Sequence, residues 1–107
     1  MIELDVRQNN LRRLAEVICK DFHIGAEQFY SRHARGRSSK ARHVFVLAAF
    51  DNGYRADEIE PMLTMHDTFV AQVLRRNYNL RKTAEYYHAY GMLKGWLGEQ
   101  QRKEAAA

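Results

Sequence analysis

Residues 53–77 constrain the fold more than any other stretch, because they contain two short amphipathic patterns separated by a tight break. Ile59, Met62 and Leu63 recur at i, i+3 and i+4, which predicts a helix over residues 56–63 with one apolar face. The second pattern consists of apolar side chains at helical spacing, namely Phe69, Val70, Val73 and Leu74. Both apolar faces need a core, so this stretch requires further helices around it.

The break between the two patterns has a capping signal. Thr64 offers a side-chain oxygen to the first turn of a helix, and Asp67, three residues later, offers an acidic partner. We therefore expect the second helix to begin near Met65. Two helices joined by a turn of about three residues form a helix-turn-helix, whose second helix can enter the major groove of DNA.

A first helix is predicted over residues 10–21, with Asn9 or Asn10 as its N-cap and Gly25 at its end. Its apolar face consists of Leu11, Leu14, Ala15, Ile18 and Phe22. These residues recur at i, i+3, i+4, i+7 and i+11, which is the spacing of an amphipathic helix.

A central helix is predicted through the apolar residues 44–50. Ser38 or Ser39 can cap its start, and residues 51–53, Asp-Asn-Gly, have the composition of a helix end. The apolar run alone would also fit a buried strand, but the sequence offers no second strand to pair with it. The fold class is therefore predicted as all-α, with five or six helices.

The last helix is predicted to begin after its cap, Thr83, and to run to about Arg102, within a C-terminal segment of residues 83–104. Its apolar face consists of Tyr86, Tyr90, Leu93, Trp96 and Leu97. This face fits packing against the rest of the chain or a homodimer contact. The glycines of this helix are Gly91, Gly95 and Gly98. Because each costs about 1 kcal/mol relative to Ala in a helix, we expect another backbone to pass close to them.

The length of 107 residues corresponds to a single domain, residues 1–107. The lone Cys19 allows no disulfide within the chain and fits a reducing compartment. No apolar run reaches the roughly 18 residues of a membrane span, and the N-terminal residues lack the pattern of a signal peptide. We therefore expect a cytoplasmic protein without a membrane partner.

The net charge of +4 is distributed unevenly along the chain. Residues 30–50 contain no acid, and their Arg and Lys residues are Arg32, Arg35, Arg37, Lys40 and Arg42. Residues 68–83 also contain no acid, and their basic residues are Arg75, Arg76, Arg81 and Lys82. An acidic stretch, residues 51–67, lies between the two blocks. This alternation suits a polyanion that approaches from one side.

These features, in this order, resemble the C-terminal DNA-binding domain of the bacterial replication initiator DnaA, a Trp-repressor-like helical module. Residues 40–43, Lys-Ala-Arg-His, are similar to that family's Arg-x-Arg-Gln, and Glu58-Ile59 is similar to its Glu-Ile. The family signature Gly-Arg-Asp-His-[Ser/Thr]-Thr-Val aligns with residues 64–70, with identity at Thr68 and Val70. The similarity spans roughly residues 11–76. Within the signature Met65 replaces Arg, and the acid and the histidine exchange places, which implies a different DNA target.

The resemblance implies a set of DNA contacts. His66, Asp67 and Thr68 would face base edges in the major groove, although Asp67 could equally serve as a helix cap. The same helix would also present Gln72, Arg75 and Arg76 to DNA. The preceding basic segment would contact phosphates or an adjacent minor groove, through Arg35, Arg37, Lys40 and Arg42. Such Arg and Lys contacts give a salt-sensitive affinity that does not depend on sequence.

Catalysis, cofactors and metal ions are not expected. The sequence lacks a Gly-rich phosphate loop of the form G-x-x-x-x-G-K-[ST], so ATP-driven initiation is not expected of this chain. Its histidines include no pair at i, i+4 and no Cys partner at ligand spacing. His66 and Asp67 are adjacent on a helix and point about 100° apart, so they do not form an orienting pair for a nucleophile.

Sequence-specific binding of double-stranded DNA, in transcription regulation or DNA replication, is the main functional prediction. One alternative is a protein-interaction module that acts as an inhibitor or adaptor through the C-terminal aromatic helix. Another is binding of RNA or single strands through the same basic loop. The aromatic residues Tyr86, Tyr87, Tyr90 and Trp96 could also stack on single-stranded bases, although their spacing fits packing better.

Overall fold

The computed structural model of the protein describes residues 2–31, 35–63, 69–76 and 78–106. The elements are α1 (Ile2–Phe22), α2 (Ala26–Tyr30), α3 (Arg37–Asp51), α4 (Ala56–Leu63), α5 (Phe69–Arg76), the 3-10 helix η1 (Tyr78–Lys82) and α6 (Ala84–Ala106). No strand occurs in the described part of the chain. The prediction of an all-α fold is therefore confirmed.

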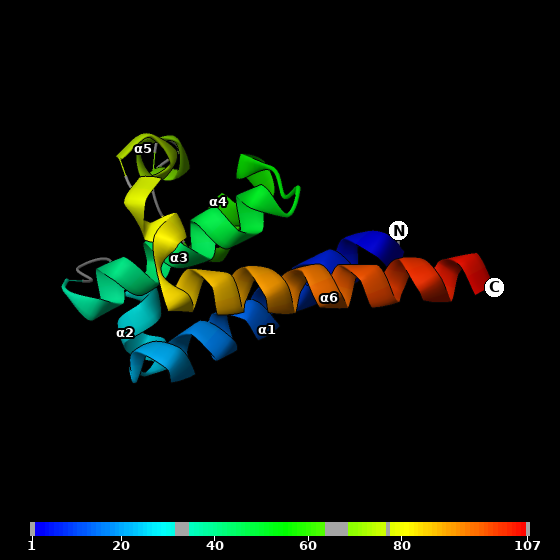
Figure 1. Ribbon diagram of the computed structural model, residues 1–107, viewed down its shortest axis with the longest axis horizontal. Helices are drawn as coiled ribbons and strands as arrows, with labels where there is room; N and C mark the ends of the chain where they lie inside the picture. The colour runs from blue at the N-terminus through cyan, green and yellow to red at the C-terminus, as the bar shows by residue number, and fades with distance from the viewer. Residues whose placement is uncertain (1, 32–34, 64–68, 77, 107) are drawn as a thin grey trace.

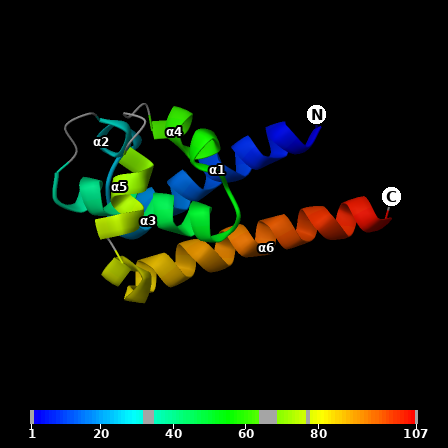
Figure 2. The same cartoon turned by 90° about the horizontal axis from the view of Figure 1, so that it is seen from above.

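The two long helices, α1 and α6, pack against each other and run in opposite directions, so both ends of the chain lie at the same end of the molecule (Figures 1 and 2). The opposite end holds α2, the start of α3, and α5. Because α6 extends beyond the packed core, the molecule is elongated, with dimensions of 44 × 27 × 26 Å.

The centre of the fold is α3, which contacts every other described element. Its residues 44–49 are completely buried, and only Phe50, at 42% exposed, departs from the apolar run expected to be internal. A helix that is apolar on nearly all sides is typical of a core element with neighbours all around it. The choice of helix over strand for this segment is thus confirmed, and the helix begins earlier and ends one residue later than the apolar run.

The start of α1 differs from the prediction. The helix begins at Ile2, and Asn10 lies inside it at 5% exposed, so neither Asn9 nor Asn10 is its N-cap. At the other end His23 adopts a positive φ of 55°, the role expected of Gly25. The His23 and Ile24 N–H groups donate to carbonyls of the last helical turn, which closes α1. Gly25 instead precedes α2 as its N-cap, in an extended conformation.

The start of α3 also differs from the prediction, because Gly36 is its N-cap and Ser38 and Ser39 lie within the helix. Its end agrees with the prediction. Asn52 is the C-cap and Gly53 follows with a φ of +92°, a conformation that glycine adopts without steric cost. The Tyr54 N–H donates to the Ala49 carbonyl and the Gly53 N–H to the Phe50 carbonyl, as in a Schellman motif.

α4 and α6 agree with the predicted pattern in most respects. α4 occupies the expected residues, with Ile59 and Leu63 buried and Pro61 inside the helix. At the start of α6 the Thr83 hydroxyl oxygen accepts the Tyr86 N–H at 3.3 Å, so Thr83 is the cap. The expected close backbone approach at Gly91, Gly95 and Gly98 is wrong, since a Cβ added at any of them would meet no atom within 4 Å.

Candidate nucleic-acid interface

The middle of α3 and the start of α5 lie next to each other in space. The rings of His43, on α3, and Phe69, the first residue of α5, are 5.9 Å apart between centroids, and the two helices pack along this side. Both segments lie at the end of the molecule away from the chain termini (Figures 1 and 2). The two basic blocks of the sequence therefore come together in the fold.

Helix α5 is strongly amphipathic. Val70 and Val73 are buried against the core, whereas Gln72, Arg75 and Arg76 are exposed. The helix contains no acidic residue, and its last turn ends with the two arginines. Its outer surface therefore offers one amide and two guanidinium groups, which are groups that hydrogen-bond to bases and phosphates.

The start of α3 contributes exposed cations beside α5. Arg35 precedes the helix, and Arg37 and Lys40 lie in its first turns. All three side chains are exposed, and residues 35–50 contain no acid. Arg32, in the preceding loop, lies outside the described residues.

The prediction that Arg42 contacts phosphate is wrong. It is 2% exposed, and its Nε donates to the backbone carbonyl of Phe29. Arg42 follows Lys40 by two residues, which turns its side chain about 200° away around the helix and toward α2. A cation in that position fixes α2 against α3 and is not accessible to a polyanion.

The three residues expected to contact base edges, His66, Asp67 and Thr68, lie outside the described residues, as do the proposed cap Thr64 and Met65. Within the described part of the expected recognition helix, the candidate contacts are Gln72, Arg75 and Arg76.

A polar network fixes the chain just after α5. The Asp51 carboxylate accepts hydrogen bonds from Arg81 Nε at 2.7 Å and Nη2 at 2.9 Å, and from the Tyr86 hydroxyl at 2.6 Å. Partial burial opposes ionisation, but the hydrogen bonds from Arg81 and Tyr86 outweigh it and lower the pKa of Asp51. Burial and the bond to Asp51 raise the pKa of Tyr86 far above its ordinary value, so its hydroxyl remains a donor.

This network ties η1 and α6 to the end of α3. Only one residue separates α5 from η1, so the position of Arg81 limits where the exposed arginines of α5 can lie. Arg81 therefore stabilises the fold and, unlike Arg75 and Arg76, is not one of the exposed arginines of the second basic block.

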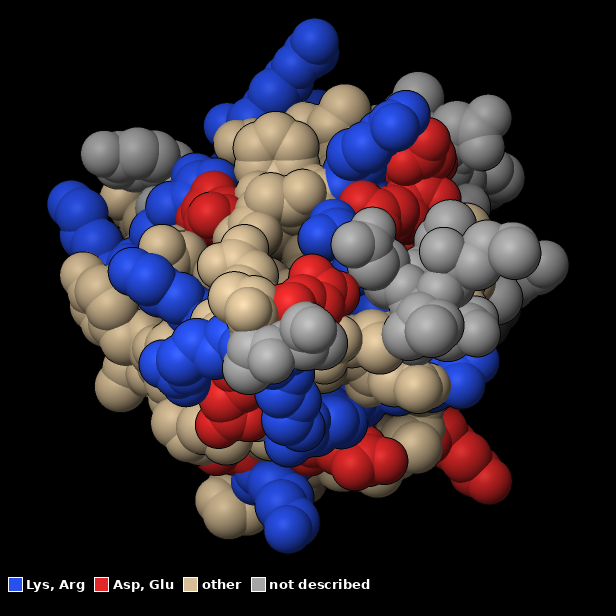
Figure 3. All heavy atoms as spheres, turned by 90° about the vertical axis from the view of Figure 1, so that its right-hand side faces the viewer, with Lys and Arg blue, Asp and Glu red and all other residues tan. Residues whose placement is uncertain are grey.

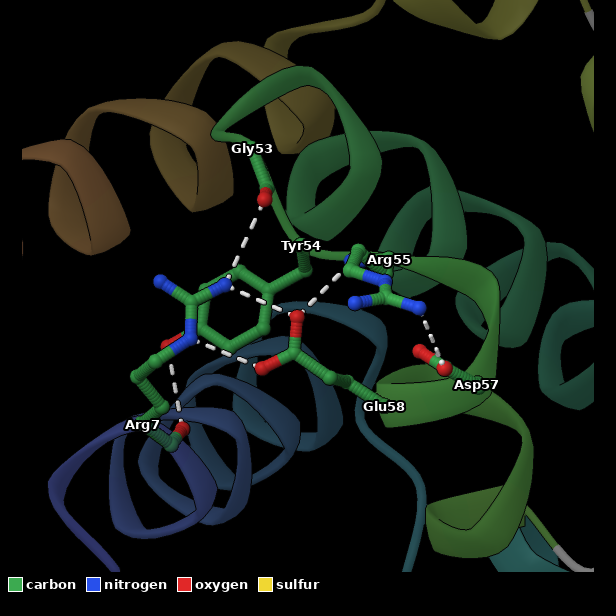
Figure 4. A network of polar contacts seen from close by, with 6 residues as sticks. All are labelled: Arg7, Gly53, Tyr54, Arg55, Asp57 and Glu58. Carbon is green, nitrogen blue, oxygen red and sulfur yellow. Dashed lines mark hydrogen bonds and ion pairs between the residues drawn. The ribbon is translucent and has the colours of Figure 1, made fainter. Parts of the chain in front are cut away.

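A second network joins α1 to the start of α4 (Figure 4). Arg7 donates through Nε and Nη2 to the two Glu58 carboxylate oxygens at 2.7 and 2.9 Å, and its guanidinium lies 4.1 Å from the centre of the Tyr54 ring. Glu58 also accepts the Arg55 N–H, which satisfies a donor at the start of α4. Sequence reasoning missed this network because its partners are far apart in the chain and have no periodic signal.

The apolar face of α6 is used within the chain. Tyr86 and Leu93 belong to the buried core, and Tyr90, Trp96 and Leu97 pack against it. The guanidinium of Arg13 also lies 4.1 Å from the Trp96 ring centre. Of the aromatic residues of α6, Tyr87 is the one most exposed, at 63%. Packing accounts for all five residues expected to serve either packing or a dimer, and a homodimer stays a prediction.

The end of the molecule where the termini lie has a different surface. There Lys and Arg side chains are interspersed with Asp and Glu (Figure 3). Cations without acidic neighbours in sequence occur instead on α5 and the start of α3. This contrast favours the α3–α5 end as the surface for an anionic partner.

Other classes of site have little support in the described residues. No group of three or more His, Cys, Asp or Glu side chains there is arranged to hold a metal ion. None of the described helices is both long and apolar enough to cross a bilayer. Comparison of the chain with family models, curated proteins and solved structures gives no match.

Proposed function

We propose that this protein binds double-stranded DNA in a sequence-specific manner through the α4–α5 helix pair, as a transcription regulator or a replication-associated factor. In this proposal α5 lies in the major groove, and Gln72 contacts a base edge. Arg75 and Arg76 bind phosphates at one end of α5, while Arg37 and Lys40 bind phosphates at the other.

The observation that supports the proposal most is the contact between His43 and Phe69. It brings two basic segments, far apart in sequence, into contact at one end of the molecule, and the outer face of α5 in the second segment has no acid. Phosphate contacts on both sides of a reading helix are the arrangement that orients such a helix on a duplex. The resemblance of the sequence to the DnaA DNA-binding domain supports the same proposal.

The alternatives that use the aromatic residues of α6, a partner interface and base stacking, have less support. Tyr86, Tyr90 and Trp96 are engaged within the fold, which leaves Tyr87 as the main exposed ring of that helix. A single exposed ring offers little area for stacking successive bases or for a partner interface.

The first prediction concerns salt dependence. We expect the logarithm of the association constant for a duplex of random sequence to fall linearly with the logarithm of salt concentration. Arg75→Ala/Arg76→Ala should reduce the magnitude of that slope by about 2, because each phosphate contact contributes about 0.9. Fluorescence anisotropy with a labelled duplex, repeated over a series of salt concentrations, measures the slope.

The matched control is Arg102→Ala/Lys103→Ala, which removes the same charge from exposed positions near the end of α6. This variant should keep the wild-type slope. Equal slopes for the α5 and α6 variants, or no binding to the duplex at low salt, would contradict the proposal.

A further inference from the structure

A groove of about 750 Å³ lies between α1 and the start of α4. Its volume falls within the roughly 300–1,000 Å³ that ligand sites occupy in proteins. Arg7, Gly53, Arg55 and Glu58, part of its lining, are visible in Figure 4. The groove lies away from the exposed arginines of α5, so it is a separate candidate site.

The apolar lining of the groove comes from both helices. Leu11 of α1 is fully buried, and Pro61 and Met62 of α4 are exposed and half-buried, respectively. Pro61 has no backbone N–H, so its ring offers a purely apolar surface inside the helix. Because Leu11 has no exposed surface, Pro61 and Met62 are the residues that can cover the apolar body of a small molecule.

Two of the three arginines of the groove already have carboxylate partners. Arg7 is bound by Glu58 through two nitrogens, and Arg55 pairs with Asp57 at 2.9 Å. Since Glu58 also accepts the Arg55 N–H, the two acids of the groove are occupied by donors from the same lining. The third arginine, Arg12, has no carboxylate partner in the described part of the chain, so it is the one most available to an incoming anion.

The Arg12 guanidinium makes one hydrogen bond among the described residues, to Asn9 Oδ1 at 3.4 Å, which is longer than the roughly 3.2 Å limit of an ordinary bond. Gln8 lies one turn earlier, on the same side of α1, and its exposed amide has no hydrogen-bond partner in the described part of the chain. The two side chains together offer a guanidinium and an amide N–H at the edge of the groove.

From this arrangement we propose that the groove binds a small amphipathic carboxylate. Its carboxylate accepts hydrogen bonds from Arg12 and Gln8, and its apolar body lies on Pro61 and Met62. The lining contains three arginines and two acids, so it has a net charge of +1 and is matched by one negative charge. The proposal does not depend on DNA binding.

The second prediction is tested with 4-phenylbutyrate, which joins one carboxylate to an apolar body. Added to the ¹⁵N-labelled protein, it should shift the amide signals of residues that line the groove and bind with a Kd of about 1 mM, given its size. Arg12→Gln should weaken binding at least tenfold, since it removes a charge-assisted hydrogen bond. The control Arg102→Gln, at an exposed position on α6, should leave the Kd unchanged.

Two further probes separate the requirements for charge and for apolar surface. Acetate, which lacks the apolar body, and 4-phenylbutanamide, which lacks the charge, should each bind at least tenfold more weakly than 4-phenylbutyrate. Equal binding of the amide, shifts confined to other parts of the molecule, or an unchanged Kd in a folded Arg12→Gln protein would overturn the proposal. Because no DNA is present, this result is independent of the DNA-binding test.

Discussion

Individual arginines of this chain have different roles that their order in sequence does not reveal. Arg37 and Lys40 are exposed, whereas Arg42, only two residues further on, is buried and hydrogen-bonded to Phe29. A count of charges along the chain correctly located the basic segment. It failed at Arg42, because the direction of a side chain depends on where neighbouring helices pack around α3, and that is decided by residues distant in sequence.

The third prediction concerns Arg42. Arg42→Ala should lower the free energy of unfolding by about 2–4 kcal/mol, because it leaves the Phe29 carbonyl without its donor and opens a cavity between α2 and α3. Urea denaturation followed by circular dichroism measures this change. Lys40→Ala, at an exposed position two residues earlier, should change stability by less than about 0.5 kcal/mol. If Arg42→Ala were as stable as Lys40→Ala, the claim that Arg42 holds α2 against α3 would be refuted.

At the scale of helices, the elements that sequence patterns located best were those with periodic apolar faces. α4, the end of α3 and the Thr83 cap of α6 agree with their predictions. The predicted helix starts are less accurate. The N-cap of α3 is Gly36 and not Ser38 or Ser39, and α1 begins at Ile2 and not at residue 10. The local sequence offers several residues able to cap, and tertiary packing selects among them. The polar links between helices had no local signal at all.

Asp51 provides one such link, and it should make stability depend on pH. Its pKa is lower in the folded protein than in the unfolded chain, despite partial burial, because Arg81 and Tyr86 donate to the ionised form. The stabilisation is therefore present above the unfolded pKa of about 3.9 and is lost as the pH falls through the lower, folded value. Glu58, whose pKa is lowered mainly by its hydrogen bond with Arg7, acts in the same direction.

The fourth prediction follows for Asp51→Asn. The variant should be less stable than the wild type at pH 7, and the difference should shrink as the pH falls below about 4, where the wild type loses the ionised carboxylate. Urea denaturation at several pH values between about 2 and 7 measures the difference. The control is Glu99→Gln, which neutralises an exposed carboxylate of α6. Its free energy of unfolding should change with pH in the same way as that of the wild type. If the difference in free energy of unfolding between Asp51→Asn and the wild type stayed constant over this range, the role of the ionised Asp51–Arg81 pair would be contradicted.

On the scale of the whole molecule, the fold brings two basic segments to one end and leaves mixed charge at the other (Figure 3). The sequence alone predicted the two blocks and the all-α class, since both follow from composition and periodicity. It did not predict that α6 would use its aromatic face internally, because packing within the chain and a dimer contact require the same pattern. The groove between α1 and α4 also had no sequence signal, because its lining comes from two distant segments.

The central claim is that α5 recognises DNA sequence, and the fifth prediction tests it by selecting preferred duplexes from a random pool. The wild-type protein should enrich a short common motif. Gln72→Ala should lose preference at one or two positions of that motif, by about 5- to 150-fold, because a base contact is worth about 1–3 kcal/mol. Arg102→Ala should enrich the wild-type motif. A pool that stays random with the wild-type protein, or a motif that Gln72→Ala leaves unchanged, would contradict the claim.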